Sequence, residues 1–357
     1  MQVLRVFAVG ATCAFMLTVD AARAQKHPLN GAASDIASFI SDYSNGAGTF
    51  VYGVSYGTVL VGRLMHLQPA TVKGYIPDGI ATSAGAPPGK FGKFFSKWEV
   101  EYGEFDNDRN SSCATLVGGG VTSTPPSYIL RSTLGNFLAN SDTQTLIPPL
   151  VYRLNRCDAN DVKVLTQFFK FLESSPSSDV MDDLKFSSLQ YYLTVFSEMW
   201  ETPAPSQAQI EARFASMSIT TGNSYDQTAG SKAATLPSDV SVLLLSGKLG
   251  PQTLHKYAEY LLAALQTSKK ELVTFNYSTH DTVNSTPLND TSDPGLTCGM
   301  KVLTSYISNS GDLQHLDMSC VNQMPSFNLT VPSNHLQDFF STDEAYDGTF
   351  QVGLSAN

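Results

Sequence analysis

The segment around Ser55 constrains the fold of this chain more than any other part of the sequence. Residues 49–52, Thr-Phe-Val-Tyr, form a β-branched and aromatic run typical of a buried strand, and residues 58–67 have helical spacing. Between them stands Gly53-Val54-Ser55-Tyr56-Gly57, with a glycine two residues to either side of the serine. Glycines let a backbone turn sharply and pack closely where a strand meets a helix. The pattern therefore predicts a strand, a strained turn that presents Ser55, and a helix.

Strand and helix patterns alternate along the rest of the chain. The run Val240–Leu245 is almost wholly aliphatic, which is typical of a central strand in a parallel sheet. The alternation predicts βαβ units, and hence an α/β fold with a mostly parallel sheet. Further strands are expected at residues 72–76 and 272–277, and helices at residues 35–43, 254–265 and 296–307.

Parallel sheets bind ligands at the carboxyl ends of their strands. Ser55, Asp78 and His280 each follow a predicted strand, so they are expected at one edge of the sheet. The pattern Gly-x-Ser-x-Gly between strand and helix is that of a nucleophile elbow, although a plain glycine-rich turn is the alternative. The helix N-terminus favours a developing negative charge, and the backbone N–H of Tyr56 is the expected oxyanion donor.

His280 is the predicted general base, because it follows the last core strand and comes after the serine in the chain. The other histidines fall in predicted helices, after the closing helix, or in weakly patterned ends. They are His27, His66, His255, His315 and His335.

Two segments resemble a known family. Tyr52-Gly-Val-Ser-Tyr-Gly-Thr58 with Pro69 and Asp78-Gly-Ile80 resembles the tripeptidyl- and prolyl-aminopeptidase branch of the α/β-hydrolases, serine peptidases of clan SC, family S33. The segment 242–253, Val-Leu-Leu-Leu-Ser-Gly-Lys-Leu-Gly-Pro-Gln-Thr, resembles the C-terminal domain of that branch. The resemblance implies a Ser–His hydrolase that cleaves short peptides from a free N-terminus beneath a helical lid, with no cofactor.

The acid of that family is missing here. Its aspartate lies in the turn after the third predicted core strand, and the matching residue is Gly250. An acid at this place holds the imidazole in its productive tautomer and stabilises the protonated ring. Asp78 is a possible substitute, with a structural role in its turn as the alternative. Asp281 is expected to point away from the His280 ring.

The ends of the chain and its middle also depart from a simple hydrolase core. Only some two dozen residues precede the elbow strand after residue 24, so the early strands and the second oxyanion donor are expected to be missing. Residues 83–237 are rich in Ser, Thr, Pro and aromatic residues, which predicts a helical lid insertion. The expected parts are a signal peptide (1–24), the elbow half of the core (25–82), the lid (83–237), the C-terminal half of the core (238–320) and a tail (321–357).

The first residues read as an export signal. Arg5 precedes the apolar run Val6–Val19, and Ala22-Arg23-Ala24 is a small-x-small cleavage site. A membrane anchor or a buried strand is the alternative for this segment; no later segment is long and apolar enough to cross a membrane. Sequons for N-glycosylation, which fit a secreted glycoprotein, occur at Asn110, Asn276, Asn284, Asn289 and Asn328.

After removal of the signal, an even number of cysteines remains, which suggests disulfides in an oxidising compartment. Three pairings are possible. The local one, Cys113 with Cys157 and Cys298 with Cys320, is expected because each pair falls within one region. No zinc-ligand spacing is present, so no metal site is predicted.

The net charge of −10 argues against nucleic acid as the partner, because phosphate binding needs clustered Lys and Arg. The sequence therefore predicts a secreted serine hydrolase that acts on peptides or on small esters and amides. A catalytically inactive binding protein on a hydrolase scaffold is one alternative, and a lipase or esterase on the same fold is another.

Overall fold

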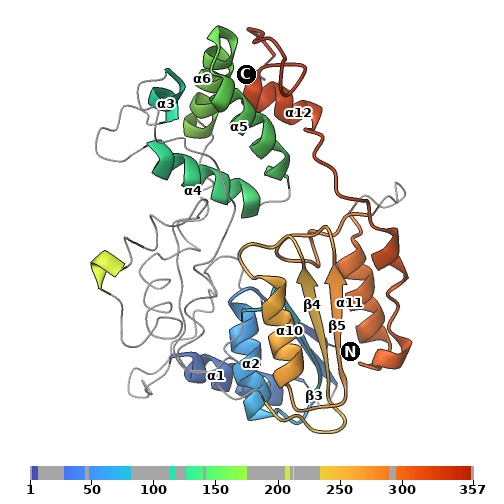
Figure 1. The fold of residues 1–357 in the computed structure, drawn as a ribbon. Helices are drawn as coiled ribbons and strands as arrows, with labels where there is room; N and C mark the ends of the chain where they lie inside the picture. The colour runs from blue at the N-terminus through green and yellow to red at the C-terminus, as the bar shows by residue number, and fades with distance from the viewer. Residues whose placement is uncertain are drawn as a thin grey trace. The chain divides into compact units, whose positions relative to one another are not determined.

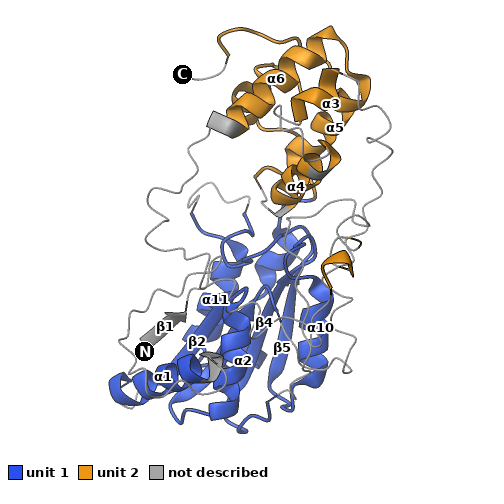
Figure 2. Cartoon of the chain, turned by 90° about the vertical axis from the view of Figure 1, so that its left-hand side faces the viewer, with its two compact units in different colours: residues 1–96, 182–205, 225–326 blue, residues 97–181, 206–224, 327–357 orange. Residues whose placement is uncertain are grey.

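The computed structural model divides into two compact units, which Figure 2 shows in different colours. The first comprises residues 1–96, 182–205 and 225–326, and the second comprises residues 97–181, 206–224 and 327–357. The structure describes residues 2–6, 28–44, 48–81, 112–117, 126–139, 142–174, 206–209, 212, 234–288 and 295–354.

The first unit is built on a five-stranded sheet in the order β1-β2-β3-β4-β5. Every neighbouring pair is parallel, so the prediction that four of these segments lie parallel in one sheet is confirmed (Figure 1). The strands are β1 (Gln2–Val6), β2 (Thr49–Val54), β3 (Val72–Asp78), β4 (Ser241–Gly247) and β5 (Lys270–Phe275).

Helices cover both faces of this sheet. Alternate residues of a strand point to opposite faces, and here both sets are apolar and pack against helices. On β4, Val242 and Leu244 pack in the core that also holds residues of α1, α2 and α10. Leu243 and Leu245 pack in a separate core with residues of α11. The helices are α1 (Pro28–Tyr43), α2 (Gly57–Leu67), α10 (His255–Ala264) and α11 (Cys298–Ser308), followed by 3-10 turns at Leu313–His315 and Ser319–Gln323.

One strand precedes the elbow strand, within the predicted signal peptide. Gln2–Val6 forms β1 and pairs in parallel with β2 along the whole segment, so in the chain as given the elbow strand has a second neighbour. The physical reason is that β2 would otherwise present a row of unpaired N–H and C=O groups, which a short valine-containing segment can satisfy. The predicted cleavage site, Ala22-Arg23-Ala24, lies outside the described residues.

The described part of the second unit is helical. Its elements are α3 (Ser112–Val117), α4 (Pro126–Ala139), η4 (Gln144–Leu146), α5 (Ile147–Arg156), α6 (Ala159–Ser174), α12 (Ser333–His335) and η8 (Leu336–Phe340). Helices were predicted for residues 83–237, of which residues 175–205, among others, lie outside the described residues.

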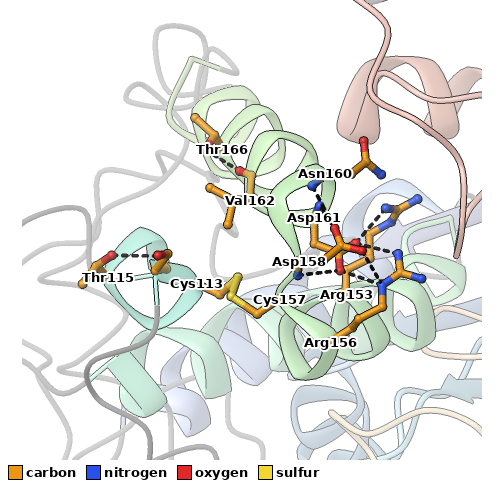
Figure 3. Close-up of a disulfide and its surroundings, with 11 residues drawn as sticks. Cys113, Thr115, Arg153, Arg156, Cys157, Asp158, Asn160, Asp161, Val162 and Thr166 are labelled. Atoms are coloured by element: carbon orange, nitrogen blue, oxygen red, sulfur yellow. Dashed lines mark hydrogen bonds and ion pairs between the residues drawn. A yellow bond between two sulfur atoms is a disulfide. The ribbon is translucent and has the colours of Figure 1, made fainter.

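The C-terminal segment belongs to the core of this helical unit, which its sequence pattern did not predict. Phe340 stacks on Phe168 of α6 with ring centroids 5.3 Å apart. Arg153, which is fully buried, donates to the carbonyl oxygens of Ala345 and Gly348 at 2.8 and 3.0 Å. Its charge is balanced by Asp161 at 3.0 Å, also buried, as Figure 3 shows. The hydrogen bonds of Arg153 thus join the C-terminal segment to α5, and its ion pair with Asp161 joins α5 to α6.

Both disulfides have the predicted pairing. Cys113–Cys157 joins α3 to the end of α5 (Figure 3). Cys298–Cys320 joins the start of α11 to the following 3-10 turn. The two cysteines of each bond are 44 and 22 residues apart in the sequence, respectively, and each bond lies within one unit.

Candidate active site

The turn at Ser55 is strained in the way the sequence predicts. Ser55 has φ 57, in the left-handed region that residues with a side chain rarely adopt. Gly53 is required beside it, because a Cβ there would lie 2.6 Å from Cγ2 of Val61 and 2.7 Å from the carbonyl oxygen of Gly57. The turn thus brings the end of β2 against the first turn of α2, and Ser55 stays partly exposed.

Hydrogen bonds hold this turn against the end of β3. The Ser55 amide donates to the carbonyl oxygen of Asp78 at 3.0 Å. The Thr58 hydroxyl donates to the Ser55 carbonyl oxygen at 2.6 Å and accepts from the Ala81 amide at 2.9 Å. Ser55 is therefore positioned by its own turn and by the strand next to it.

His280 lies in the loop after β5, and its ring packs against two residues of other loops. Nδ1 of His280 is 2.8 Å from the hydroxyl oxygen of Thr253, in the turn that follows β4. On another side stands Gly79, where a Cβ would lie only 2.6 Å from Nδ1. Burial of the imidazole lowers the pKa of His280 to about 4, and the charge of Asp281 opposes this shift. The ring is therefore neutral at physiological pH.

Asp78 is engaged elsewhere and is not brought to the imidazole. The buried carboxylate accepts from the Thr282 amide and hydroxyl at 3.0 and 2.7 Å, and from the Val283 amide at 3.0 Å. The Tyr52 hydroxyl donates to it at 3.0 Å. No hydrogen bond joins Asp78 to His280 within the described part of the chain. Asp78 thus anchors the loop that carries His280, which is the structural role that the sequence left open for it.

Burial raises the pKa of Asp78 to about 6, although its hydrogen bonds with Thr282 and Val283 act in the opposite direction. Asp281 has φ 58, and its carboxylate makes no hydrogen bond to the imidazole among the described residues. Its carboxylate accepts from the Tyr52 hydroxyl at 3.3 Å and from the Asn284 side-chain amide at 2.8 Å. Neither carboxylate therefore orients the ring of His280.

Gly250 occupies the position at which the family resemblance implies the catalytic acid. A Cβ at Gly250 would lie 3.3 Å from the carbonyl carbon of Thr279 and 3.4 Å from the backbone nitrogen of His280. The position faces the loop of His280, as the spacing predicted, but it carries no side chain. Thr253, three residues later, makes the contact with Nδ1 instead. Sequence reasoning missed Thr253, because a single threonine in a turn carries no distinctive signal.

The structure brings Ser55 and His280 to the same part of the sheet edge through the end of β3. Ser55 bonds to the backbone of Asp78, and the next residue, Gly79, is in contact with the His280 ring. Among the described residues, the Ser55 hydroxyl makes no hydrogen bond to the imidazole. Such bonds are often long before substrate binds. Tyr56 directly precedes α2, where its amide was predicted to serve as an oxyanion donor.

The remaining predicted residues are distributed as follows. Asn276, Asn284 and Asn328 are exposed, whereas Asn110 and Asn289 lie outside the described residues. Within the described ranges, no three His, Cys, Asp or Glu side chains gather in a way that could hold a metal ion. No helix in those ranges has the length and apolar character needed to cross a membrane.

The parallel sheet, the left-handed Ser55 between β2 and α2, and the histidine after β5 together define the α/β-hydrolase fold class. The helical segments inserted between β3 and β4 belong to the same predicted architecture.

No family model and no curated protein matches this chain. Among solved structures, it is similar to a monoacylglycerol lipase of Paleococcus ferrophilus, with 17% identity, TM-score 0.30, and coverage of 71% of this chain and 67% of the lipase. A serine hydrolase of Cycloclasticus zankles gives 13% identity, TM-score 0.30, and coverage of 70% of this chain and 62% of that one. An esterase of Exiguobacterium antarcticum gives 14% identity, TM-score 0.27, and coverage of 72% and 68%. The chain thus spans less than two thirds of the Cycloclasticus enzyme, and its substrate has to be argued from its own site.

Proposed function

We propose that this protein is a serine hydrolase in which Ser55 is the nucleophile and His280 the general base. The observation that carries the proposal is the strained φ 57 of Ser55 at the end of β2. Strain of this kind persists only where the surrounding structure holds it, and it gathers at functional sites. Two further observations support the pairing of Ser55 with His280: the Ser55 amide bonds to Asp78, whose neighbour Gly79 is in contact with the His280 ring, and that ring is neutral at physiological pH.

In the proposed reaction the Ser55 oxygen attacks the carbonyl carbon of the substrate while His280 takes its proton. The protonated imidazole then gives that proton to the leaving group. Water next attacks the acyl-enzyme while His280 takes its proton, the bond between the acyl group and the Ser55 oxygen breaks, and His280 returns the proton to that oxygen. The Tyr56 amide and the N-terminus of α2 stabilise the negative charge on the carbonyl oxygen.

Peptides cleaved from a free N-terminus are the proposed substrates, on the resemblance of residues 52–58 and 242–253 to aminopeptidases. Small esters and amides pass through the same acyl chemistry, so a lipase or esterase activity is the alternative within this function. Comparison of an aminoacyl anilide with a short-chain ester, using the same preparation, separates the two.

Slow turnover is part of the proposal. Among the described residues no carboxylate is hydrogen-bonded to the imidazole, and an imidazole with a pKa of about 4 is a weak base. Loss of the orienting acid costs about 10⁴ in turnover in serine proteases. The same observations favour a second candidate, a binding protein that keeps the hydrolase fold without turnover.

We also propose export as a glycoprotein with both disulfides closed. The exposed sequon residues Asn276, Asn284 and Asn328 support this proposal, as do the two disulfides. Removal of a signal ending at Ala24 would also remove β1 and leave β2 at the edge of the sheet.

A fluorophosphonate probe tests the proposed function, because it reacts with an activated serine and not with a merely exposed one. We expect labelling of the intact protein, no labelling of Ser55→Ala, and strongly reduced labelling of His280→Ala. Ser310→Ala is the matched control, since Ser310 is an exposed serine with φ 56 at the end of α11, and it should label like the wild type. A folded wild type that does not label would reject the hydrolase in favour of the binding protein.

A further inference from the structure

The contact between Thr253 and His280 occupies the place of the missing acid. Thr253 lies in the turn after β4, the turn in which the acid was expected, and its hydroxyl oxygen is 2.8 Å from Nδ1. Thr253 is only 4% exposed, and its contact with the half-buried His280 ring is partly buried. Gly79 closes it from another side, because a Cβ there would be 3.2 Å from the Thr253 hydroxyl oxygen.

A hydroxyl and a carboxylate differ in what they demand of an imidazole. A carboxylate only accepts, so it requires a proton on Nδ1 and leaves the lone pair of Nε2 free to take a proton. A hydroxyl can accept from Nδ1–H or donate to an unprotonated Nδ1. In the second case the proton of the neutral ring sits on Nε2, and the ring cannot act as a base toward a serine.

No other interaction among the described residues fixes which ring nitrogen of His280 carries the proton. The Thr253 hydroxyl has no second hydrogen-bond partner there, so no neighbour directs its proton away from Nδ1. The two carboxylates considered for this role, Asp78 and Asp281, are hydrogen-bonded to the Tyr52 hydroxyl and to residues 282–284 instead. The ring is therefore held in place without being held in one tautomer.

We propose that Thr253 is the positioning residue of His280, and that it leaves the imidazole distributed between a productive and an unproductive tautomer. This inference rests on the proposed function, which it deepens by assigning the residue that acts through the base. The hydroxyl keeps the ring oriented, and the unfixed tautomer limits the fraction of molecules in which Ser55 can be activated.

Three variants test the role of the hydroxyl. Thr253→Val keeps the shape and removes the hydroxyl, and Thr253→Ser keeps the hydroxyl. Thr279→Val is the matched control, because Thr279 is also 4% exposed and has no side-chain hydrogen bond among the described residues. We expect the fluorophosphonate labelling rate to fall about tenfold or more in Thr253→Val, and to stay near the wild-type rate in Thr253→Ser and Thr279→Val.

Nitrogen-15 NMR of histidine-labelled protein gives a readout that does not depend on activity. His280 should show Nδ1 and Nε2 shifts intermediate between the pure tautomers in the wild type and in Thr253→Ser, and altered shifts in Thr253→Val. A wild type locked in one tautomer would overturn the proposal, even if no variant folds. Unchanged labelling in Thr253→Val would overturn the positioning role. A third outcome separates the two proposals. If the wild type does not label, but its His280 shifts are intermediate and change in Thr253→Val, then the hydrolase proposal is rejected and the positioning of His280 by Thr253 stands.

Discussion

A Cβ atom on Gly79 would lie 2.6 Å from Nδ1 of His280, far inside any ordinary contact between two side chains. Gly79 also has φ 58, a backbone conformation that favours glycine. The imidazole can therefore occupy its place beside Thr253 only because residue 79 has no side chain.

We predict that Gly79→Ala displaces the imidazole and lowers fluorophosphonate labelling of Ser55 by about tenfold or more. The strained backbone should also reduce the free energy of unfolding, by about 1–3 kcal/mol in a urea titration. Gly62→Ala is the control, because a Cβ at Gly62, inside α2, meets nothing within 4 Å. It should label normally and be stabilised by about 0.5–1 kcal/mol. Normal labelling of Gly79→Ala would show that the His280 ring does not need this place.

The labelling rate should depend on pH through His280. Because burial lowers its pKa to about 4 from 6.5, the ring stays neutral and able to act as a base well below pH 6.5. We expect labelling to persist as the pH falls through 6 and to be half lost near pH 4. Labelling rates measured on folded protein between pH 3.5 and 8, with circular dichroism as the check on folding, decide the point. Half-loss near pH 6.5 would contradict the burial of the ring.

Asp78 and His280 should shift stability with pH in opposite directions. The pKa of Asp78 in the folded protein is about 6, above its ordinary 3.8. Its stabilising contribution to the free energy of unfolding is therefore fully present below pH 3.8 and is lost as the pH rises through 6. The pKa of His280 in the folded protein is about 4, below its ordinary 6.5. Its stabilising contribution to the free energy of unfolding is therefore fully present above pH 6.5 and is lost as the pH falls through 4. In wild-type protein these two effects should offset each other between about pH 4 and 6.

Asp78→Asn removes the first effect and leaves the second. Whatever the overall loss of stability from the altered contacts with Thr282 and Val283, the free energy of unfolding of this variant should rise more steeply with pH than that of the wild type between about pH 4 and 6. Urea titrations at several pH values give both slopes. Parallel curves would mean that Asp78 titrates near its ordinary pKa in the folded protein.

Gly250→Asp should restore part of the missing support for the imidazole. Gly250 does not have a left-handed φ, and a Cβ there would lie 3.3 Å from the carbonyl carbon of Thr279, so the backbone of the His280 loop has to shift by a few tenths of an ångström to admit a side chain. A carboxylate facing the His280 loop should raise the labelling rate about tenfold and move its pH midpoint upward. Gly250→Asn is the control for size without charge. An equal effect of both variants, or of neither, would argue against a vacant acid position.

The state of the cysteines and of the N-terminus can be read together by mass spectrometry. Secreted material should begin at or near Gln25 and contain no alkylatable thiol at Cys113, Cys157, Cys298 or Cys320. Replacing the pair Cys298 and Cys320 by serine should lower the free energy of unfolding by about 2–5 kcal/mol. Retention of residues 2–6 in the secreted protein would instead support β1 as a lasting part of the sheet.

Much of the fold follows from local sequence pattern. The aliphatic run at residues 240–245 predicted a buried strand, which β4 confirms, and the glycines around Ser55 predicted the strained turn that its φ 57 displays. The local cysteine pairing was also predicted correctly. These features depend on residues that are neighbours in the chain, or on spacing within one region.

Other features were decided by contacts between distant segments. Pairing of residues 2–6 with β2 and docking of residues 336–348 on α5 and α6 depend on a vacant strand edge and on buried partners that local pattern does not reveal. The surroundings of His280 are the clearest case. The sequence by itself determined that a serine and a histidine follow strands of one parallel sheet and that residue 250 carries no carboxylate. Only the tertiary structure decided that Asp78 is occupied by Thr282 and Val283 and that Thr253 contacts Nδ1, because hydrogen-bond partners are set by the approach of loops far apart in the chain.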